Sequence, residues 1–431
     1  MFLPTAHWWT GQVSDAVGAS WPAWQLAHHG TLDLAGRTLP ANVNFLHQPG
    51  GMVVAQRTMG VILIAVPVNF LLAWTHWGPE QTGAVTASLT SAIAVANIAV
   101  VFRAFTNPRR AVMGALVLAF GTGMWTVASA ELWTHGPATM WLSLGLLLLT
   151  RDRLLLAGCA LSPALLTRPH LAVVSAIVGI WIGLARRSPR ATLAIGAPSV
   201  LTLGLLVRWN DWYFGTASVG GPYHGAIAAA VRPPTDAAVM FLTNVAGTVV
   251  SGWCGIVWYS PVVLVLAAAV PVGWRQAPDW ARASLVAGLV YLAIQLRVDT
   301  FTGGGTFYGN RLVLELFVLA TPVVMIGYER WAAERPWRTA AVTVAASLSI
   351  GIYAVGALLP GYRVGGAFSN WTVWYPALVV RAAGSLGALV VAGVTLCVAF
   401  SVREAISRAR AQNRPPPPTP VPPLVRSTSS A

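Results

Sequence analysis

Charged residues are scarce in this chain of 431 residues, and lysine is absent altogether. Only 9% of the residues are charged, whereas a soluble globular domain carries about 25%. Hydrophobic residues make up 56%, and apolar runs close to the ~20 residues that cross a bilayer recur along the chain. This composition excludes a water-soluble globule and a disordered chain, and the alternating pattern of barrel strands is absent. We therefore expect an all-α polytopic integral membrane protein.

Several chemical motifs are also missing. The three cysteines, Cys159, Cys254 and Cys397, lie in apolar surroundings without metal-ligand spacing, so we expect small buried side chains there. The chain has no nucleotide-phosphate loop of the GxxxxGK[ST] type and no Cys/His metal set. Met1 to Gly30 shows no basic region followed by an apolar run, and hence no cleavable signal peptide. No resident metal or cofactor is predicted from these residues.

The net charge of +14 comes entirely from arginine. A basic balance can indicate a nucleic-acid partner, but here the arginines gather in short clusters between apolar runs, which is typical of cytoplasmic loops. We expect no nucleic-acid partner. The expected cytoplasmic segments are 103–110, 151–153, 186–190, 275–282, 329–338 and the tail from Ser401.

About eleven membrane-spanning helices alternate between these clusters. They are expected near 83–102, 111–130, 136–150, 154–168, 170–185, 191–207, 255–273, 282–297, 311–328, 339–359 and 378–400. The run 58–77 is apolar enough to span, but a crossing there would place 103–110 outside. We expect it to lie in, or dip into, the outer leaflet.

Three regions follow from this topology. Residues 1–82 form an extracytoplasmic loop with juxtamembrane helices, 83–400 form the transmembrane domain, and 401–431 form a Pro-rich, disordered cytoplasmic tail. A polar, aromatic N-terminus is seldom exported alone, so we expect a transmembrane helix upstream of it; the alternative is a protein that manages without one. The long aromatic loops lie outside, at 1–57, 208–254, 298–310 and 360–377. The working face is therefore expected to be extracytoplasmic.

Carboxylates at the outer boundary are functional candidates, because they are costly to bury in so acid-poor a chain. They are Asp15, Asp33, Glu80, Glu131, Asp211, Asp236, Asp299 and Glu315. Asp15 begins a segment in which Trp21, Trp24 and His28 follow helical spacing, which predicts an amphipathic helix on the outer leaflet. A helix N-terminus favours an ionised carboxylate, as a general base requires. The alternative is that Asp15 only caps the helix.

Two further segments each carry one candidate ligand-binding side chain, His135 or Arg168. His135 is expected at the outer mouth with Glu131, where it either holds a phosphate or pairs with Glu131. Arg168 lies between two apolar runs, where it either binds a lipid phosphate or snorkels to the interface.

The segment Val298 to Leu312 contains a glycine run that lets backbone approach a ligand closely. Tyr308, Asn310 and Arg311 beside it are candidates for binding a phosphate or sugar hydroxyls. A flexible turn is the alternative.

Five segments in order resemble the GT-C superfamily of polytopic glycosyltransferases, in particular actinobacterial-type members related to the protein mannosyl- and aminoarabinose-transferases. They are Asp15 with the later HGTLDL, FGTGMWTVASAELWTHGP, LLTRPH, SGWCGIVWYSPVV and DTFTGGGTFYGNR. Two features depart from the family pattern: the first transmembrane helix before the acidic residue is missing, and the spacing from Asp15 to Pro22 is a residue short.

The resemblance implies an inverting sugar transfer at the outer face of the plasma membrane. The donor is a polyprenyl-phosphate sugar that enters from the bilayer, and the acceptor is a glycan, a lipid or a protein. By match, Asp15 is the base, with Asp33 sharing the role, and His135, Arg168 and Arg311 lie on the phosphate side. Some relatives need a divalent metal and others do not, so metal dependence stays open.

Two other functions remain as alternatives. A lipid-linked sugar flippase or transporter would need charged or broken helices at the midplane, whereas the polar residues here gather at one face. A non-catalytic membrane protein of the same fold differs from the enzyme only in the chemistry of Asp15, because fold alone does not establish activity.

Overall fold

The computed structural model describes residues 2–8, 14–39, 45–48, 50–223, 234–252, 254–303 and 307–358. The predicted last span at 378–400, the outer loop at 360–377 and the tail at 401–431 lie outside these ranges. The boundary predicted between the transmembrane domain and the tail therefore stays a prediction.

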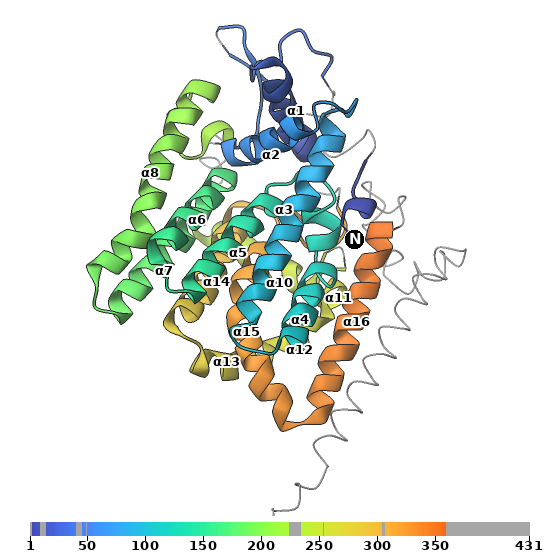
Figure 1. Ribbon diagram of the computed structural model, residues 1–431, viewed down its shortest axis with the longest axis vertical. Helices are drawn as coiled ribbons and strands as arrows, with labels where there is room; N and C mark the ends of the chain where they lie inside the picture. Colours follow the sequence, from blue (N-terminus) through green and yellow to red (C-terminus); the bar gives the residue numbers. More distant parts are fainter. Residues whose placement is uncertain are drawn as a thin grey trace, which may run out of the picture.

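The described chain is a bundle of helices with one small hairpin, which confirms the all-α fold (Figure 1). The helices are α1 (Ser14–His29), α2 (Met59–Leu71), α3 (Pro79–Phe102), α4 (Pro108–Phe120), α5 (His135–Thr150), α6 (Leu154–Thr167), α7 (Ala172–Ala185), α8 (Pro189–Phe214), α10 (Pro234–Val250), α11 (Ile256–Tyr259), α12 (Pro261–Ala267), α13 (Val270–Gln276), α14 (Asp279–Val298), α15 (Leu314–Glu334) and α16 (Pro336–Leu358). The hairpin pairs β1 (Phe45–His47) antiparallel to β2 (Val53–Ala55), with Leu46 opposite Val54. Short turns η1 (Leu3–Thr5), η2 (Met124–Ala128), η3 (Pro169–Leu171) and η4 (Gly221–Tyr223) complete the described elements.

Five of these helices are long and apolar enough to cross a bilayer, namely α3, α8, α14, α15 and α16. Local sequence explains where several of them begin. Proline stands at or beside the first position of α3, α4 and α8, where its missing N–H costs no hydrogen bond. The side chains of Asn107 and Ser188 accept hydrogen bonds from the first turns of α4 and α8.

With five helices long and apolar enough to cross a bilayer, the chain is a multi-pass membrane protein.

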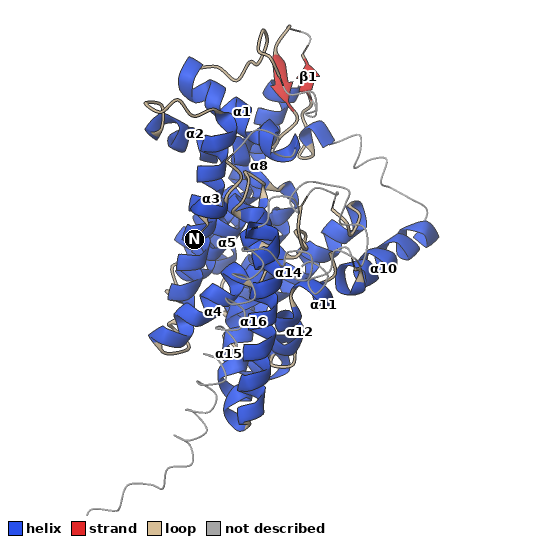
Figure 2. Ribbon diagram, turned by 90° about the vertical axis from the view of Figure 1, so that its right-hand side faces the viewer, coloured by secondary structure: helices blue, strands red, loops and turns tan. Residues whose placement is uncertain are grey.

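Three predicted elements differ from the observed ones. The span expected over 111–130 ends at Phe120 and continues as the π-helical turn η2, because Gly121 and Gly123 interrupt the helix. The span expected over 255–273 is divided into α11, α12 and α13, with Pro261 starting the second piece. The region 208–254, expected as a loop, contains the helix α10, which projects from the bundle in Figure 2.

One end of the bundle, which we call the α1 end, carries α1, α2 and the hairpin (Figures 1 and 2). The helix α2 has only 13 residues and lies across the end of α3 in Figure 1; its position in the outer leaflet stays a prediction. The helix α1 is not an isolated surface helix. It packs on α2 and α3, and Ala16, Ala19, Ser20 and Ala23 are buried.

Candidate functional site

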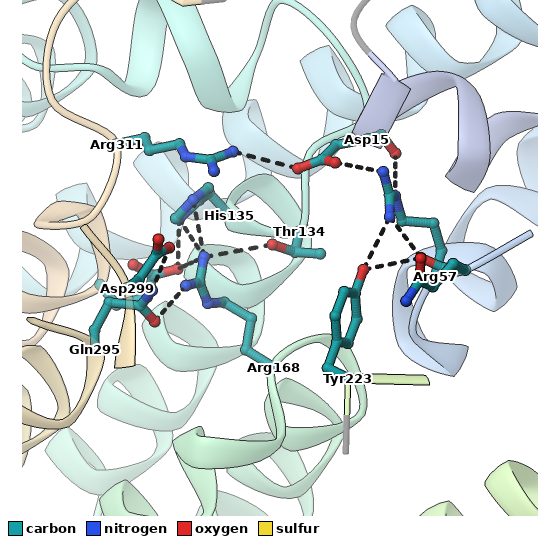
Figure 3. Close-up of polar contacts among 11 residues, drawn as sticks. Asp15, Arg57, Thr134, His135, Arg168, Tyr223, Gln295, Asp299 and Arg311 are labelled. Atoms are coloured by element: carbon teal, nitrogen blue, oxygen red, sulfur yellow. Dashed lines mark hydrogen bonds and ion pairs between the residues drawn. The ribbon is translucent and has the colours of Figure 1, made fainter. Parts of the chain in front are cut away.

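The polar side chains at the α1 end converge from helix termini (Figure 3). The contributing residues are Asp15 at the start of α1, Arg57 just before α2, Thr134 and His135 at the start of α5, Arg168 after α6, Gln295 and Asp299 at the end of α14, and Arg311 and Glu315 around the start of α15. Four of these termini are helix N-termini, whose partial positive charge favours anions. Together with three guanidiniums, they make this end of the bundle suited to a negatively charged ligand.

The carboxylate of Asp15 lies between two arginines. Arg57 Nη2 pairs with Oδ1, and Arg311 Nη1 lies 3.4 Å from Oδ2. The Asp15 side chain is 43% exposed, whereas those of Arg57 and Arg311 are 8% and 14% exposed. The acid is thus the most exposed member of this trio.

The guanidinium of Arg57 is held on all sides by the protein. Its Nε donates to the backbone carbonyl of Asp15 at 3.0 Å, and its Nη1 donates to the carbonyl of Gln56 and, at 2.9 Å, to the hydroxyl of Tyr223. Tyr223 in turn donates to the Gln56 carbonyl at 2.8 Å. Burial raises the pKa of the Tyr223 phenol, so this donor keeps its proton at neutral pH. Arg57 therefore orients Asp15.

Arg168 points into the bundle and not to the interface. Its side chain is 10% exposed, with Nη1 2.8 Å from His135 Nε2 and Nη2 2.7 Å from Gln295 Oε1. The snorkelling alternative is therefore wrong for this structure. Its Nε is buried and, within the described ranges, has no hydrogen-bond partner.

His135 pairs with a residue far away in the sequence. Its Nδ1 lies 2.8 Å from Glu315 Oε1, and both side chains are buried. The predicted pairing of His135 with Glu131 is wrong, because Glu131 pairs with His7 of the N-terminal segment. Glu315 lies at the start of α15, and the packing of α15 at the α1 end brings its carboxylate to the His135 ring.

Arg311 is held by aromatic rings. Its Cζ lies 4.6 Å from the ring centre of Trp133 and 4.9 Å from that of Phe307, distances at which cation–π attraction operates. Like Arg168, it has a buried Nε without a hydrogen-bond partner in the described part of the chain. Gly303, at φ +58°, allows the close approach, because a Cβ there would lie 2.9 Å from that Nε.

Tyr308 and Asn310 have other neighbours than the arginines. The ring of Tyr308 packs at 5.2 Å on Tyr259 within an aromatic cluster that includes Tyr353. Asn310 Oδ1 accepts from the backbone N–H of Leu312 at 3.0 Å and so shapes the turn before α15. The glycine-containing segment thus delivers Arg311 to the site.

Asp33 supports the loop that leads to the hairpin. Its Oδ1 accepts from the backbone N–H groups of Ala35 and Val53, each at 2.9 Å. Among the hydrogen bonds and ion pairs of the described residues, none connects its carboxylate to Asp15. The structure therefore assigns Asp33 a local structural contact.

Arg57, Tyr223 and Gln295 are absent from the residues singled out in the sequence. The sequence does mark Arg57 as a candidate, since it is the one charged residue between Arg37 and Glu80 and directly precedes an apolar run. Tyr223 and Gln295 are not marked in this way, because polar residues of their type are common in loops and helix ends.

The described residues around Asp15 do not fit a divalent cation. Both carboxylate oxygens face guanidiniums. Over the described ranges, no group of three or more His, Cys, Asp or Glu side chains is placed to hold a metal ion.

The fold and the site define the class: an all-α multi-pass membrane protein with a buried, arginine-rich site at one end of its bundle. No protein-family model and no curated protein matches the sequence. Among solved structures, the chain is similar to the oligosaccharyltransferase AglB of Archaeoglobus fulgidus in complex with an inhibitory peptide and a dolichol-phosphate, at 12% identity and a TM-score of 0.46 over 82% of this chain. The form of the Archaeoglobus fulgidus enzyme with Zn and sulfate gives 14% identity and a TM-score of 0.47 over 87%. This chain spans about half (52%) of either structure's length, and similarity at this level carries no argument about activity.

Proposed function

We propose that this protein is a membrane glycosyltransferase of the GT-C type. It transfers a sugar from a polyprenyl-phosphate donor to a glycan, lipid or protein acceptor on the extracytoplasmic side of the plasma membrane. In this proposal the α1 end faces outward and the C-terminus is cytoplasmic. Asp15 is the general base.

The observation that carries the proposal is the position of Asp15 between Arg57 and Arg311. A hydroxyl acceptor needs a carboxylate that is accessible yet fixed, and Asp15 is 43% exposed while its partners Arg57 and Arg311 are only 8% and 14% exposed. The leaving phosphate needs cationic donors, and guanidiniums suit phosphate oxygens. Arg168 and Arg311 each retain a buried Nε–H without a partner in the described chain, which a phosphate oxygen can satisfy.

The reaction follows from these positions. The acceptor hydroxyl oxygen forms a bond to the anomeric carbon of the sugar while the bond from that carbon to the phosphate oxygen breaks. The electron pair of the broken bond leaves with the polyprenyl phosphate, and the hydroxyl proton passes to Asp15. Attack opposite the leaving phosphate inverts the configuration, and Arg168 and Arg311 stabilise the charge that develops on the phosphate.

The test is sugar transfer in proteoliposomes with labelled polyprenyl-phosphate mannose and arabinose. Asp15→Asn keeps the size of the side chain but cannot take up a proton, so we expect turnover to fall at least about a hundredfold while donor binding is retained. Asp211→Asn is the matched control, because Asp211 is also half-exposed and pairs with an arginine, Arg208. Both residues lie on α8. It should leave turnover unchanged.

Other results would redirect the proposal. Equal activity of wild type and Asp15→Asn would exclude Asp15 as the base. Loss of turnover in Asp33→Asn alone would move the base to Asp33, since an amide oxygen preserves both hydrogen bonds that Asp33 accepts. Lipid-linked sugar crossing the bilayer without transfer would favour the flippase alternative.

A further inference from the structure

Two chains of hydrogen bonds end on Arg168. In the first, Glu315 accepts from His135 Nδ1 at 2.8 Å, and Arg168 Nη1 lies 2.8 Å from His135 Nε2 and 3.1 Å from Nδ1. With the ring proton on Nδ1, Nε2 is the nitrogen that can accept from Arg168. In the second, Asp299 Oδ2 accepts from Gln295 Nε2 at 3.1 Å, and Gln295 Oε1 accepts from Arg168 Nη2 at 2.7 Å. Each chain therefore starts at a carboxylate and fixes one terminal nitrogen of the same guanidinium.

The buried carboxylate of Glu315, which begins the first chain, needs the nearby guanidinium of Arg168 to offset the cost of its burial. Glu315 and His135 have side chains that are 0% and 1% exposed, and Glu315 Oε1 is also 3.8 Å from Arg168 Nη1. A buried carboxylate is expensive in an apolar bundle without a cationic or hydrogen-bonding partner. The histidine alone does not require a carboxylate, because a neutral ring needs only an acceptor at Nδ1.

We infer that Glu315 and Asp299 are positioning residues, which fix the guanidinium of Arg168 through His135 and Gln295 for binding of the lipid phosphate. This inference rests on the proposed function. With both terminal nitrogens directed at protein partners, the guanidinium plane is set, and the buried Nε–H that has no partner in the described chain keeps a defined direction. His135 thereby acts on Arg168 and is not itself a phosphate ligand.

The experiment is a double-mutant cycle on binding of sugar-free polyprenyl phosphate to the full chain in nanodiscs. Glu315→Gln should weaken binding about tenfold in the wild-type background and have no further effect in an Arg168→Gln background. Glu329→Gln is the control, since Glu329 lies on the same helix, pairs with Arg110 at the opposite end and should leave binding unchanged. In turnover, Glu315→Gln should raise the donor KM and leave the acceptor KM unchanged.

A second variant protects the test against misfolding. Asp299→Ala removes the acceptor of the other chain at a residue that is only partly buried, and its effect should also disappear in the Arg168→Gln background. If the fold-losses in binding of the single variants multiply in the double variants with Arg168→Gln, the inference is overturned, because the carboxylates then act independently of the arginine. The same holds if neither variant changes binding.

The outcomes also separate this inference from the proposed function. Coupled binding effects without sugar transfer from any donor would leave the positioning role standing and contradict the glycosyltransferase. Wild-type protein that does not bind polyprenyl phosphate would overturn both.

Discussion

The arginines of the site differ in how completely the protein satisfies them. Every nitrogen of Arg57 has a partner, supplied by Asp15, Gln56 and Tyr223, whereas Arg168 and Arg311 each keep one buried N–H without a partner in the described chain. A fully bonded guanidinium serves as a fixed support, and one with an unused donor is suited to a ligand. Substitutions at the two kinds of arginine should therefore affect different kinetic constants.

Tyr223→Phe tests the supporting role of Arg57. Loss of the hydroxyl leaves one Arg57 N–H and the Gln56 carbonyl with weaker contacts, so kcat should fall about three- to tenfold while the donor KM stays constant. The measurement is steady-state transfer in proteoliposomes between pH 6 and 8. The effect should not vary over that range, because the raised pKa keeps the Tyr223 phenol protonated throughout.

The control for this variant is Tyr259→Phe. Tyr259 belongs to the buried aromatic cluster and its ring packing survives the change. Equal losses in both variants would indicate a general effect of removing a buried hydroxyl and would count against the support of Arg57 by Tyr223.

Scarcity of charge made most of the site predictable at the residue scale. Asp15, Arg168 and Arg311 are conspicuous because charged residues are rare in this chain. The partners could not be predicted, since the acid that pairs with His135 lies 180 positions further on. The packing of Tyr308 could not be predicted for a related reason: a loop sequence does not reveal which ring joins an aromatic cluster.

At the scale of elements, close helix crossings depend on glycine. The helices α13 and α15 cross at Gly273 and Gly327; a Cβ on Gly273 would lie 2.9 Å from the backbone nitrogen of Gly327, and one on Gly327 would lie 3.1 Å from that of Gly273. Small residues allow such approaches in membranes, where helix association depends on packing.

Gly273→Ala should therefore destabilise the bundle. The new methyl group meets backbone, which cannot rotate away, so we expect a cost of about 1–3 kcal/mol and a lower Tm in detergent. Gly204→Ala on α8 is the matched control, since nothing lies within 4 Å of the added Cβ and alanine favours the helix. A Tm for Gly273→Ala at or above that of this control would disprove the close crossing.

Helix starts were easier to predict than helix interruptions. Apolar length placed the starts of α3, α8, α14 and α15 to within a few residues. The interruptions after Phe120 and at Ser260 depend on tertiary contacts. A Cβ on Gly123, for example, would lie 2.8 Å from the carbonyl oxygen of Asn310, so contact with a segment distant in the sequence requires glycine at this position.

At the scale of the whole molecule, the arrangement of helices concentrates chemistry at one end. Composition predicted a helical membrane bundle, because so apolar a chain must satisfy its backbone hydrogen bonds within helices. It could not predict which helix termini meet, since that depends on how the helices pack. The charged side chains at the opposite end pair with one another, for example Arg186 with Asp152 and Arg110 with Glu329.

The orientation of this bundle is the last prediction. The exposed arginines at Arg103, Arg109, Arg151 and Arg187 lie at the end opposite Asp15, and arginine-rich loops stay in the cytoplasm. In a chain freed of its three cysteines, a membrane-impermeant maleimide should label His29→Cys in intact cells. It should label Arg109→Cys only after permeabilisation. Both sites are exposed, so accessibility within the protein does not separate them. The reverse pattern would place Asp15 on the cytoplasmic side, and an extracytoplasmic acceptor would then be impossible.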